Sequence, residues 1–167
     1  MAETMVRMGE LATSAVAGDV LVSLGLGSCI GLALLDRRLA VAGLAHVVLP
    51  ASNGNAARGT WKFADHAVPE LINRVVKLGA RRPMLEAVLV GGASMFAVSK
   101  SSLEVGQRNE AAVRDLLRAE RINVIATETG GSRGRTIRVY VGSHKVTVRE
   151  AGGTEKPLVP GAAGIAA

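Results

Sequence analysis

The only cysteine of this 167-residue chain, Cys29, follows directly on a glycine-rich turn, Leu24–Ser28. Two apolar stretches come next, and the second of them carries His46. If these stretches pair as a hairpin with a short symmetric loop centred on Arg37 and Arg38, Cys29 lies directly opposite His46. The Cβ atoms of such a pair are about 4.5–5.5 Å apart. The spacing therefore predicts a thiol near an imidazole and makes Cys29 a candidate nucleophile.

The chemistry of this pair depends on proton transfer. The thiolate is the reactive form of cysteine, and a free thiol with a pKa of about 8.5 is little ionised at neutral pH. An adjacent imidazole accepts the thiol proton and raises the thiolate fraction. The glycines before Cys29 allow backbone N–H groups to approach a substrate and form an oxyanion hole. Gly31 and Ala33 follow on the same side of the strand and leave room beside the sulfur.

The same two residues have a purely structural interpretation. Free cysteine is among the most buried residue types and usually packs as a small hydrophobe. A histidine on an apolar strand is usually a core residue with satisfied hydrogen bonds. The predicted hairpin register gives the catalytic interpretation equal weight, and both interpretations stay open at this point.

Composition limits the class of protein. The length fits one domain, and the core must consist of Val, Leu, Ile and Ala because aromatic residues make up only 2% of the chain. No apolar run reaches the roughly 18 residues of a membrane span, and the N-terminus lacks a signal-peptide pattern. One cysteine cannot form an internal disulfide, which is typical of a reducing compartment. We therefore expect a cytoplasmic protein without membrane insertion.

The net charge of +6 is unevenly distributed, with a basic excess between Arg108 and Arg149. Such a surface suits an acidic partner. The basic residues are scattered, however, and the few aromatic residues do not form a stacking platform, so nucleic acid is not an expected partner.

The hydrophobic pattern predicts a mixed α/β (α+β) fold in a single domain over residues 1–150. Two helices are expected, at 65–78, where Pro69 disturbs the pattern, and at 107–120. The pattern predicts more strands than two helices can cover, so part of the sheet must pack on other strands. Beyond residue 150 the composition turns to Gly, Pro and Ala, and we expect a flexible tail over 151–167. The expected strands cover residues 20–24, 29–35, 39–48, 84–90, 122–127, 135–141 and 145–149.

Several motifs in order, from about Met8 to Arg149, resemble the chemoreceptor glutamine deamidase family, CheD. The order and approximate spacing of these motifs carry the resemblance, whereas the glycine turn alone would not. The matching segments are residues 24–29 (LGLGSC), 43–50 (GLAHVVLP), 63–65 (FAD), 91–96 (GGASMF), 106–109 (GQRN) and 129–135 (TGGSRGR).

The resemblance implies a cytoplasmic enzyme that hydrolyses glutamine side-chain amides on chemoreceptors, with a layered α/β sandwich like that of a necrotizing toxin that deamidates Rho GTPases. By matching position, Cys29 is the nucleophile and His46 the general base. Ser23 replaces the family's threonine, and its hydroxyl is expected to hydrogen-bond the imidazole. Backbone N–H groups around Gly27 and Ser28 are the expected oxyanion donors. The mechanism needs no metal and no organic cofactor.

The remaining motifs have weaker interpretations. Asn109 is expected to open a helix, either as its cap or as part of a site for a polar substrate group. The segment Gly91–Ser94 is expected to be a structural turn or a pocket wall, and Asp65 a helix N-cap.

Three alternatives compete with the enzyme. Because some family members bind the phosphatase CheC, this chain is alternatively a regulatory binding module for a CheC-type phosphatase or receptors, although retention of Cys29 and His46 argues against it. Nucleotide binding through Gly25 and Gly27 conflicts with the spacing of the glycines and with the strand that follows. A redox-sensing thiol would lack a resolving cysteine.

Overall fold

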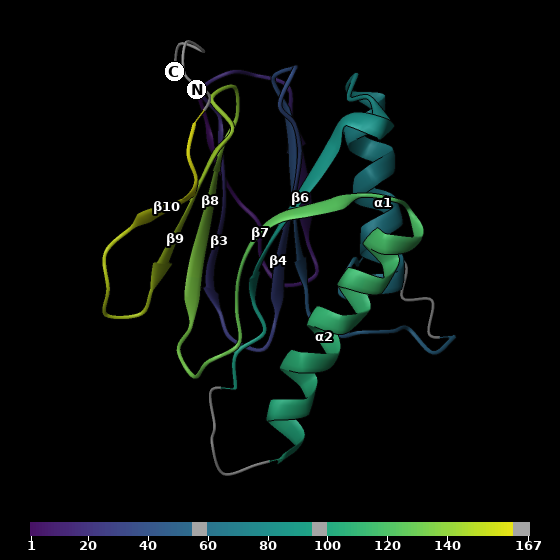
Figure 1. The fold of residues 1–167 in the computed structure, drawn as a ribbon, viewed down its shortest axis with the longest axis vertical. Coiled ribbons are helices and arrows are strands. Elements are labelled where there is room, and N and C mark those ends of the chain that lie inside the picture. Colours follow the sequence, from purple (N-terminus) through teal and green to yellow (C-terminus); the bar gives the residue numbers. More distant parts are fainter. Residues whose placement is uncertain (55–59, 95–99, 162–167) are drawn as a thin grey trace.

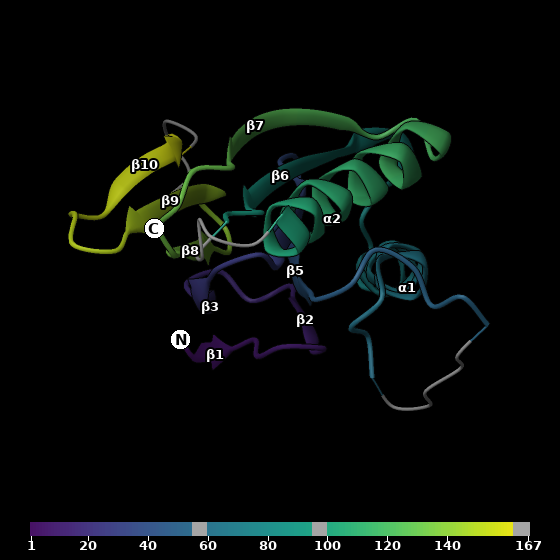
Figure 2. The same ribbon diagram turned by 90° about the horizontal axis from the view of Figure 1, so that it is seen from below.

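The structure, a computed structural model, describes residues 1–54, 60–94 and 100–161. In this part of the chain two five-stranded sheets lie face to face, and two helices cover the outer face of one of them (Figures 1 and 2). The molecule therefore has three layers. The expected α+β fold, with part of its sheet packed on other strands, is confirmed.

The two sheets are mixed. All strand pairs are antiparallel except β1 with β3 and β6 with β7, which are parallel. The strands β3 and β4 are consecutive in the chain but belong to different sheets, so the turn before Cys29 crosses from one sheet to the other. Sheet A has the spatial order β1 (Glu3–Met5), β3 (Val20–Leu26), β8 (Arg135–Tyr140), β9 (Lys145–Glu150) and β10 (Lys156–Val159), and sheet B the order β2 (Leu11–Ser14), β5 (Val41–Val47), β4 (Ile30–Asp36), β6 (Leu85–Gly91) and β7 (Asn123–Thr129).

The helices are α1 (Ala64–Lys77) and α2 (Lys100–Ala119), and a short 3-10 helix, η1 (Arg82–Met84), precedes β6. Helix α1 matches the expected range and contains Pro69 in its interior. Helix α2 begins well before the predicted start at residue 107. Asn109 therefore lies inside α2 and does not cap it, which corrects the sequence-based prediction.

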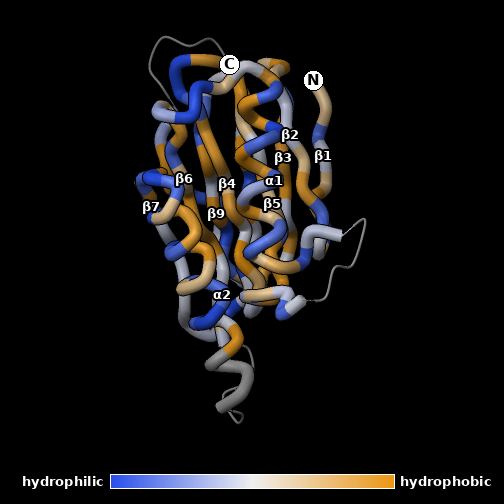
Figure 3. Tube along the Cα trace, turned by 90° about the vertical axis from the view of Figure 1, so that its right-hand side faces the viewer, coloured by the Kyte–Doolittle hydropathy of each residue, from blue (hydrophilic) through white to orange (hydrophobic). Residues whose placement is uncertain are grey.

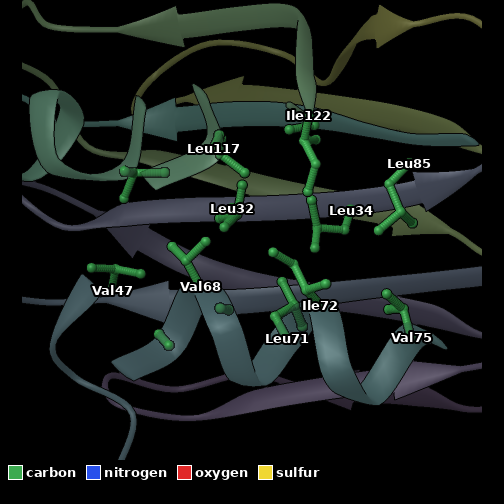
Figure 4. Packing of buried hydrophobic residues seen from close by; sticks show 14 of the residues in the cluster. Leu32, Leu34, Val47, Val68, Leu71, Ile72, Val75, Leu85, Leu117 and Ile122 are labelled. Carbon is green, nitrogen blue, oxygen red and sulfur yellow. The ribbon is translucent and has the colours of Figure 1, made fainter. Parts of the chain in front are cut away.

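Buried apolar side chains fill both spaces between the layers. Successive side chains of a strand point to opposite faces, so Leu32 of β4 faces the helices while Ala33 faces sheet A. Figure 4 shows Leu32 between Val68 of α1 and Leu117 of α2. Figure 3 shows the central strands of sheet B as largely hydrophobic, in keeping with their burial on both faces.

Two further expectations are wrong. Asp65 does not cap α1, whose N-cap is Phe63. The Asp65 carboxylate instead accepts hydrogen bonds from the backbone N–H (3.0 Å) and the hydroxyl Oγ (2.8 Å) of Ser52. The segment 151–167 is not simply a tail, because β10 lies within it, pairs with β9 and buries Val159. The short strands β1, β2 and β10 lack a long apolar run, and the sequence did not reveal them.

Candidate active site

The β4–β5 hairpin places Cys29 and His46 on the same face of sheet B, but not directly opposite each other. His46 pairs with Gly31, and the loop covers residues 37–40, so the predicted pairing of Cys29 with His46 is wrong by two residues. A shift of two residues keeps every side chain on its face. Cys29 is therefore a diagonal neighbour of His46, a relationship that places Cβ atoms roughly 7 Å apart in a regular sheet.

The thiol and the imidazole lie at the edge of the core between the two sheets. Cys29 is 8% exposed and His46 5% exposed. No hydrogen bond joins them in the described part of the chain. The space beside Gly31 is already occupied, because a Cβ built there would lie 2.8 Å from Leu26 Cδ1 and 3.1 Å from Ile137 Cγ2. The expectation that Gly31 leaves room beside the sulfur is therefore wrong, since sheet A packs into that room.

The His46 ring is held by a main-chain carbonyl. His46 Nδ1 lies 3.1 Å from the carbonyl oxygen of Val6, in the segment between β1 and β2. A carbonyl only accepts hydrogen bonds, so Nδ1 carries the proton and Nε2 is left as the basic nitrogen. The Ser23 hydroxyl donates to the same carbonyl at 2.8 Å, so the expected hydrogen bond from Ser23 to the imidazole is not formed. Sequence reasoning missed Val6 because a backbone carbonyl has no residue-type signature.

Burial keeps both candidate groups neutral. It raises the pKa of the Cys29 thiol, an effect that the residue's own N–H partly opposes by hydrogen-bonding the thiolate. Burial lowers the pKa of His46, opposed by the hydrogen bond to Val6 and by the charge of Glu10. Desolvation disfavours the charged form of each group, which is the thiolate of one and the imidazolium of the other. The resting pair is therefore thiol and imidazole, and not an ion pair.

Three successive carbonyls of the turn before β4 are held by donors from elsewhere. The carbonyl of Gly27 accepts from the Ala93 N–H (2.8 Å), and that of Cys29 accepts from the Gly92 N–H (2.8 Å). The carbonyl between them, on Ser28, accepts from the side chain of Asn109 (2.9 Å). In contrast, the N–H groups of Ser28 and Cys29 donate to no other residue in the described part of the chain. The turn thus has fixed carbonyls, and beside the thiol it has N–H donors that no other described residue uses.

The Gly91–Ser94 segment packs against this turn and donates two of the hydrogen bonds that hold its carbonyls. Gly91 has a φ of +117°, and a Cβ built there would lie 2.1 Å from the Cys29 carbonyl oxygen, so only glycine fits. Arg135, from the motif over residues 129–135, donates to the carbonyls of Gly91 (3.3 Å) and Gly130 (2.7 Å). These contacts support the structural interpretation of the segment Gly91–Ser94.

No group of three or more His, Cys, Asp or Glu side chains is arranged to hold a metal ion within the described ranges. The candidate reactive groups of the site are a thiol, a neutral imidazole and backbone N–H donors. No described helix is both long and apolar enough to cross a membrane.

Comparison with known proteins decides the family. The family model described as "CheD chemotactic sensory transduction" matches residues 48–150. A protein of Methanococcus vannielii named "Probable chemoreceptor glutamine deamidase CheD" is 41% identical over 145 residues, covering 87% of this chain and 93% of its own. The chain belongs to the CheD family. An alignment of that length leaves about 22 of the 167 residues outside it, so it includes both Cys29 and His46.

A second relative matches a slightly longer part of the chain. A protein of Archaeoglobus fulgidus with the same name is 38% identical over 154 residues, covering 92% of this chain and 96% of its own. Among solved structures, the Bacillus licheniformis hypothetical protein YfiH has a TM-score of 0.46 at 13% identity, over 73% of this chain and 49% of that one.

Proposed function

We propose that this CheD chain hydrolyses the side-chain amides of glutamines in chemoreceptors to glutamate and ammonia. The names of its relatives support the reaction and the substrate class. The observation that carries the proposal is the fixed tautomer of His46, whose protonated Nδ1 leaves Nε2 as a base on the same face as Cys29. The purely structural interpretation of this pair explains neither the free N–H donors beside the thiol nor the family.

The first half-reaction forms a thioester. His46 Nε2 takes the thiol proton as Cys29 Sγ attacks the carboxamide carbon, and the carbonyl electron pair moves onto oxygen. Because the resting groups are neutral, proton transfer and attack are coupled. The N–H groups of Cys29 and Ser28 donate to the oxyanion. When the tetrahedral intermediate collapses, His46 returns its proton to the departing nitrogen, the C–N bond breaks and ammonia leaves.

The second half-reaction restores the thiol. His46 removes a proton from water, and the hydroxide attacks the thioester carbon through a second oxyanion. The C–S bond then breaks, and the proton on His46 goes to the Cys29 sulfur. Val6 keeps the ring oriented through both halves, and its carbonyl dipole stabilises the transient imidazolium. Ser23 acts on the same carbonyl and has an indirect role.

The proposed setting follows from the substrate. Receptor glutamines lie on cytoplasmic domains, so we place the protein in the cytoplasm with those domains as its main partner. A CheC-type phosphatase remains an additional partner predicted by the family resemblance alone. No cofactor is required by the steps above.

The test is mass spectrometry of a chemoreceptor cytoplasmic fragment after incubation with the protein. Wild type is expected to convert specific glutamines to glutamate, a gain of about 1 Da at each, whereas Cys29→Ala is inert. Conversion by both proteins would exclude Cys29 as the nucleophile. Binding without conversion by wild type would favour the regulatory binding module instead.

A further inference from the structure

Asn109 connects α2 to both halves of the candidate site. Its Nδ2 donates to the carbonyl of Ser28, directly before the nucleophile, and to the carbonyl of Val48, two residues after His46, each at 2.9 Å. The side chain has no exposed surface. Both N–H bonds of the amide are therefore used within the protein, and neither is free for a substrate.

The arrangement is costly for a helix residue. Asn109 Oδ1 is buried and has no hydrogen-bond partner in the described part of the chain. An unpartnered buried acceptor destabilises a fold. A leucine has the same branched shape and would avoid that cost, but it has no donor. What asparagine supplies at this position is one nitrogen that donates to two carbonyls from segments far apart in the sequence.

Helix α2 approaches closely enough for this contact because of Gly106, one turn before Asn109. A Cβ built on Gly106 would lie 2.6 Å from the carbonyl oxygen of Gly92 and 3.0 Å from that of Ala93. The helix backbone thus packs directly on the turn whose N–H groups hold the Gly27 and Cys29 carbonyls. The nucleophile turn, residues 27–29, thus has all three of its carbonyls held by α2 and by the segment on which α2 packs.

The orientation of one peptide plane follows. The C=O and N–H of a trans peptide point in opposite directions, and no cis peptide bond is present among the described residues. Holding the Ser28 carbonyl against Asn109 therefore turns the Cys29 N–H away from α2. That N–H lies beside its own sulfur, which is where the oxyanion forms when sulfur attacks a carbonyl carbon.

We infer that Asn109 is a positioning residue that orients the Ser28–Cys29 peptide as an oxyanion donor and fixes it relative to the strand of His46. The inference rests on the proposed deamidase function. Losing one oxyanion donor typically lowers kcat by about 10²- to 10³-fold. Because Asn109 does not contact substrate, KM is expected to stay unchanged.

The experiment compares Asn109→Leu with wild type in two reactions. Deamidation of the receptor fragment needs an oxyanion hole, whereas alkylation of Cys29 by iodoacetamide is a displacement at carbon that forms no oxyanion. We expect kcat for deamidation to fall on the order of 100-fold or more, with KM within about twofold of wild type. Alkylation should fall far less, since the Cys29 N–H only partly opposes the effect of burial on the thiol pKa. Val113→Ala is the matched control, since Val113 is buried on the next turn of α2 and faces the helix–sheet core. It should lower stability but leave kcat nearly unchanged.

Asn109→Asp provides a second readout that depends on pH. A protonated carboxyl group regains one donor, whereas the carboxylate has none. The ratio of variant to wild-type kcat should therefore rise as the pH falls. The ratio is taken per folded molecule, because burying a carboxylate also makes folding depend on pH. This readout decides the question if Asn109→Leu does not fold.

Three results overturn the inference. One is wild-type kcat in a folded Asn109→Leu variant. Another is an equal loss of alkylation and deamidation, and the third is a pH-independent ratio for Asn109→Asp. If wild type itself alkylates but never deamidates, the proposed function fails, and the inference fails with it. The wild-type control therefore separates the two failures.

Discussion

Ser23 and His46 donate to one acceptor, the carbonyl oxygen of Val6, at 2.8 Å from Oγ and 3.1 Å from Nδ1. The hydroxyl belongs to sheet A, the ring to sheet B and the carbonyl to the segment that joins β1 to β2. The imidazole is thus oriented by a neutral main-chain group, and Ser23 fixes that group without a hydrogen bond to the ring. A neutral acceptor fixes the tautomer as a carboxylate would, but it stabilises the imidazolium less.

This geometry predicts a small effect of Ser23→Ala. The Val6 carbonyl keeps its hydrogen bond from His46, so no buried acceptor is left unpaired. We expect a loss of about 1 kcal/mol in the free energy of unfolding and a fall in deamidation rate of roughly tenfold or less, far below that of Cys29→Ala. Urea denaturation and single-turnover mass spectrometry measure both. The control, Ser23→Thr, keeps the hydroxyl and should retain activity. A loss as large as that of Cys29→Ala would mean that Ser23 acts directly in catalysis.

The buried, neutral pair predicts a distinctive pH dependence. Burial raises the pKa of Cys29, so its alkylation by iodoacetamide should increase with pH to a midpoint above that of a free cysteine. Burial lowers the pKa of His46, so the base stays deprotonated, and deamidation persists, below the usual value of 6.5. Cys29 is the only cysteine, so thiol alkylation reports on it alone. A midpoint below that of free cysteine would indicate a thiolate–imidazolium pair and contradict the neutral resting state.

Gly91→Ala should damage the nucleophile turn. Its Cβ would overlap the Cys29 carbonyl oxygen at 2.1 Å, and the φ of +117° is unfavourable for alanine. Gly152→Ala is the matched control, because its φ of +83° carries a similar backbone cost and no atom lies within 4 Å of the added Cβ. We expect the control to lose about 1 kcal/mol of stability and to keep its activity.

The expected loss for Gly91→Ala is several-fold larger in stability, together with most of the deamidase activity per folded molecule. Thermal unfolding and the deamidation assay on both variants test this difference. Equal behaviour of the two glycine variants would show that the turn tolerates displacement of the Cys29 carbonyl.

Arg135→Ala tests whether the hydrogen bonds of Arg135 to the carbonyls of Gly91 and Gly130 stabilise the protein. Arg135 is 7% exposed and lies 3.3 Å from a carboxylate oxygen of Glu128, although the two atoms are not aligned for a hydrogen bond. Glu128 is 20% exposed and keeps its ion pair with Lys156 at 3.0 Å. Arg135→Ala therefore mainly removes two hydrogen bonds to carbonyls and should cost about 2 kcal/mol in the free energy of unfolding. Arg133→Ala removes an exposed charge 3.8 Å from Glu150 and should cost less than about 1 kcal/mol. Denaturant titration of both variants measures the contrast, and equal costs would argue against a structural role for Arg135.

Local pattern was enough to locate most elements and the two candidate catalytic groups. The apolar run of β4 is continuous because both of its faces are buried, and a run of that kind identifies a strand without knowledge of its neighbours. The family motifs similarly point to Cys29 and His46. The start of α2 was missed because Asn109, with its capping preference, resembled a helix beginning although it lies in the helix interior.

Residue pattern alone predicts that Cys29 and His46 share a face of the sheet, because alternation along paired strands survives a register error of two residues. The surroundings of these two residues depend on how the sheets and helices pack. The register depended on which four residues form the loop, and the space beside Gly31 depended on how sheet A packs. The Val6 carbonyl and the two hydrogen bonds of Asn109 join segments that are distant in the chain. Such contacts depend on how sheets and helices pack in three dimensions, which no local pattern of residue types records.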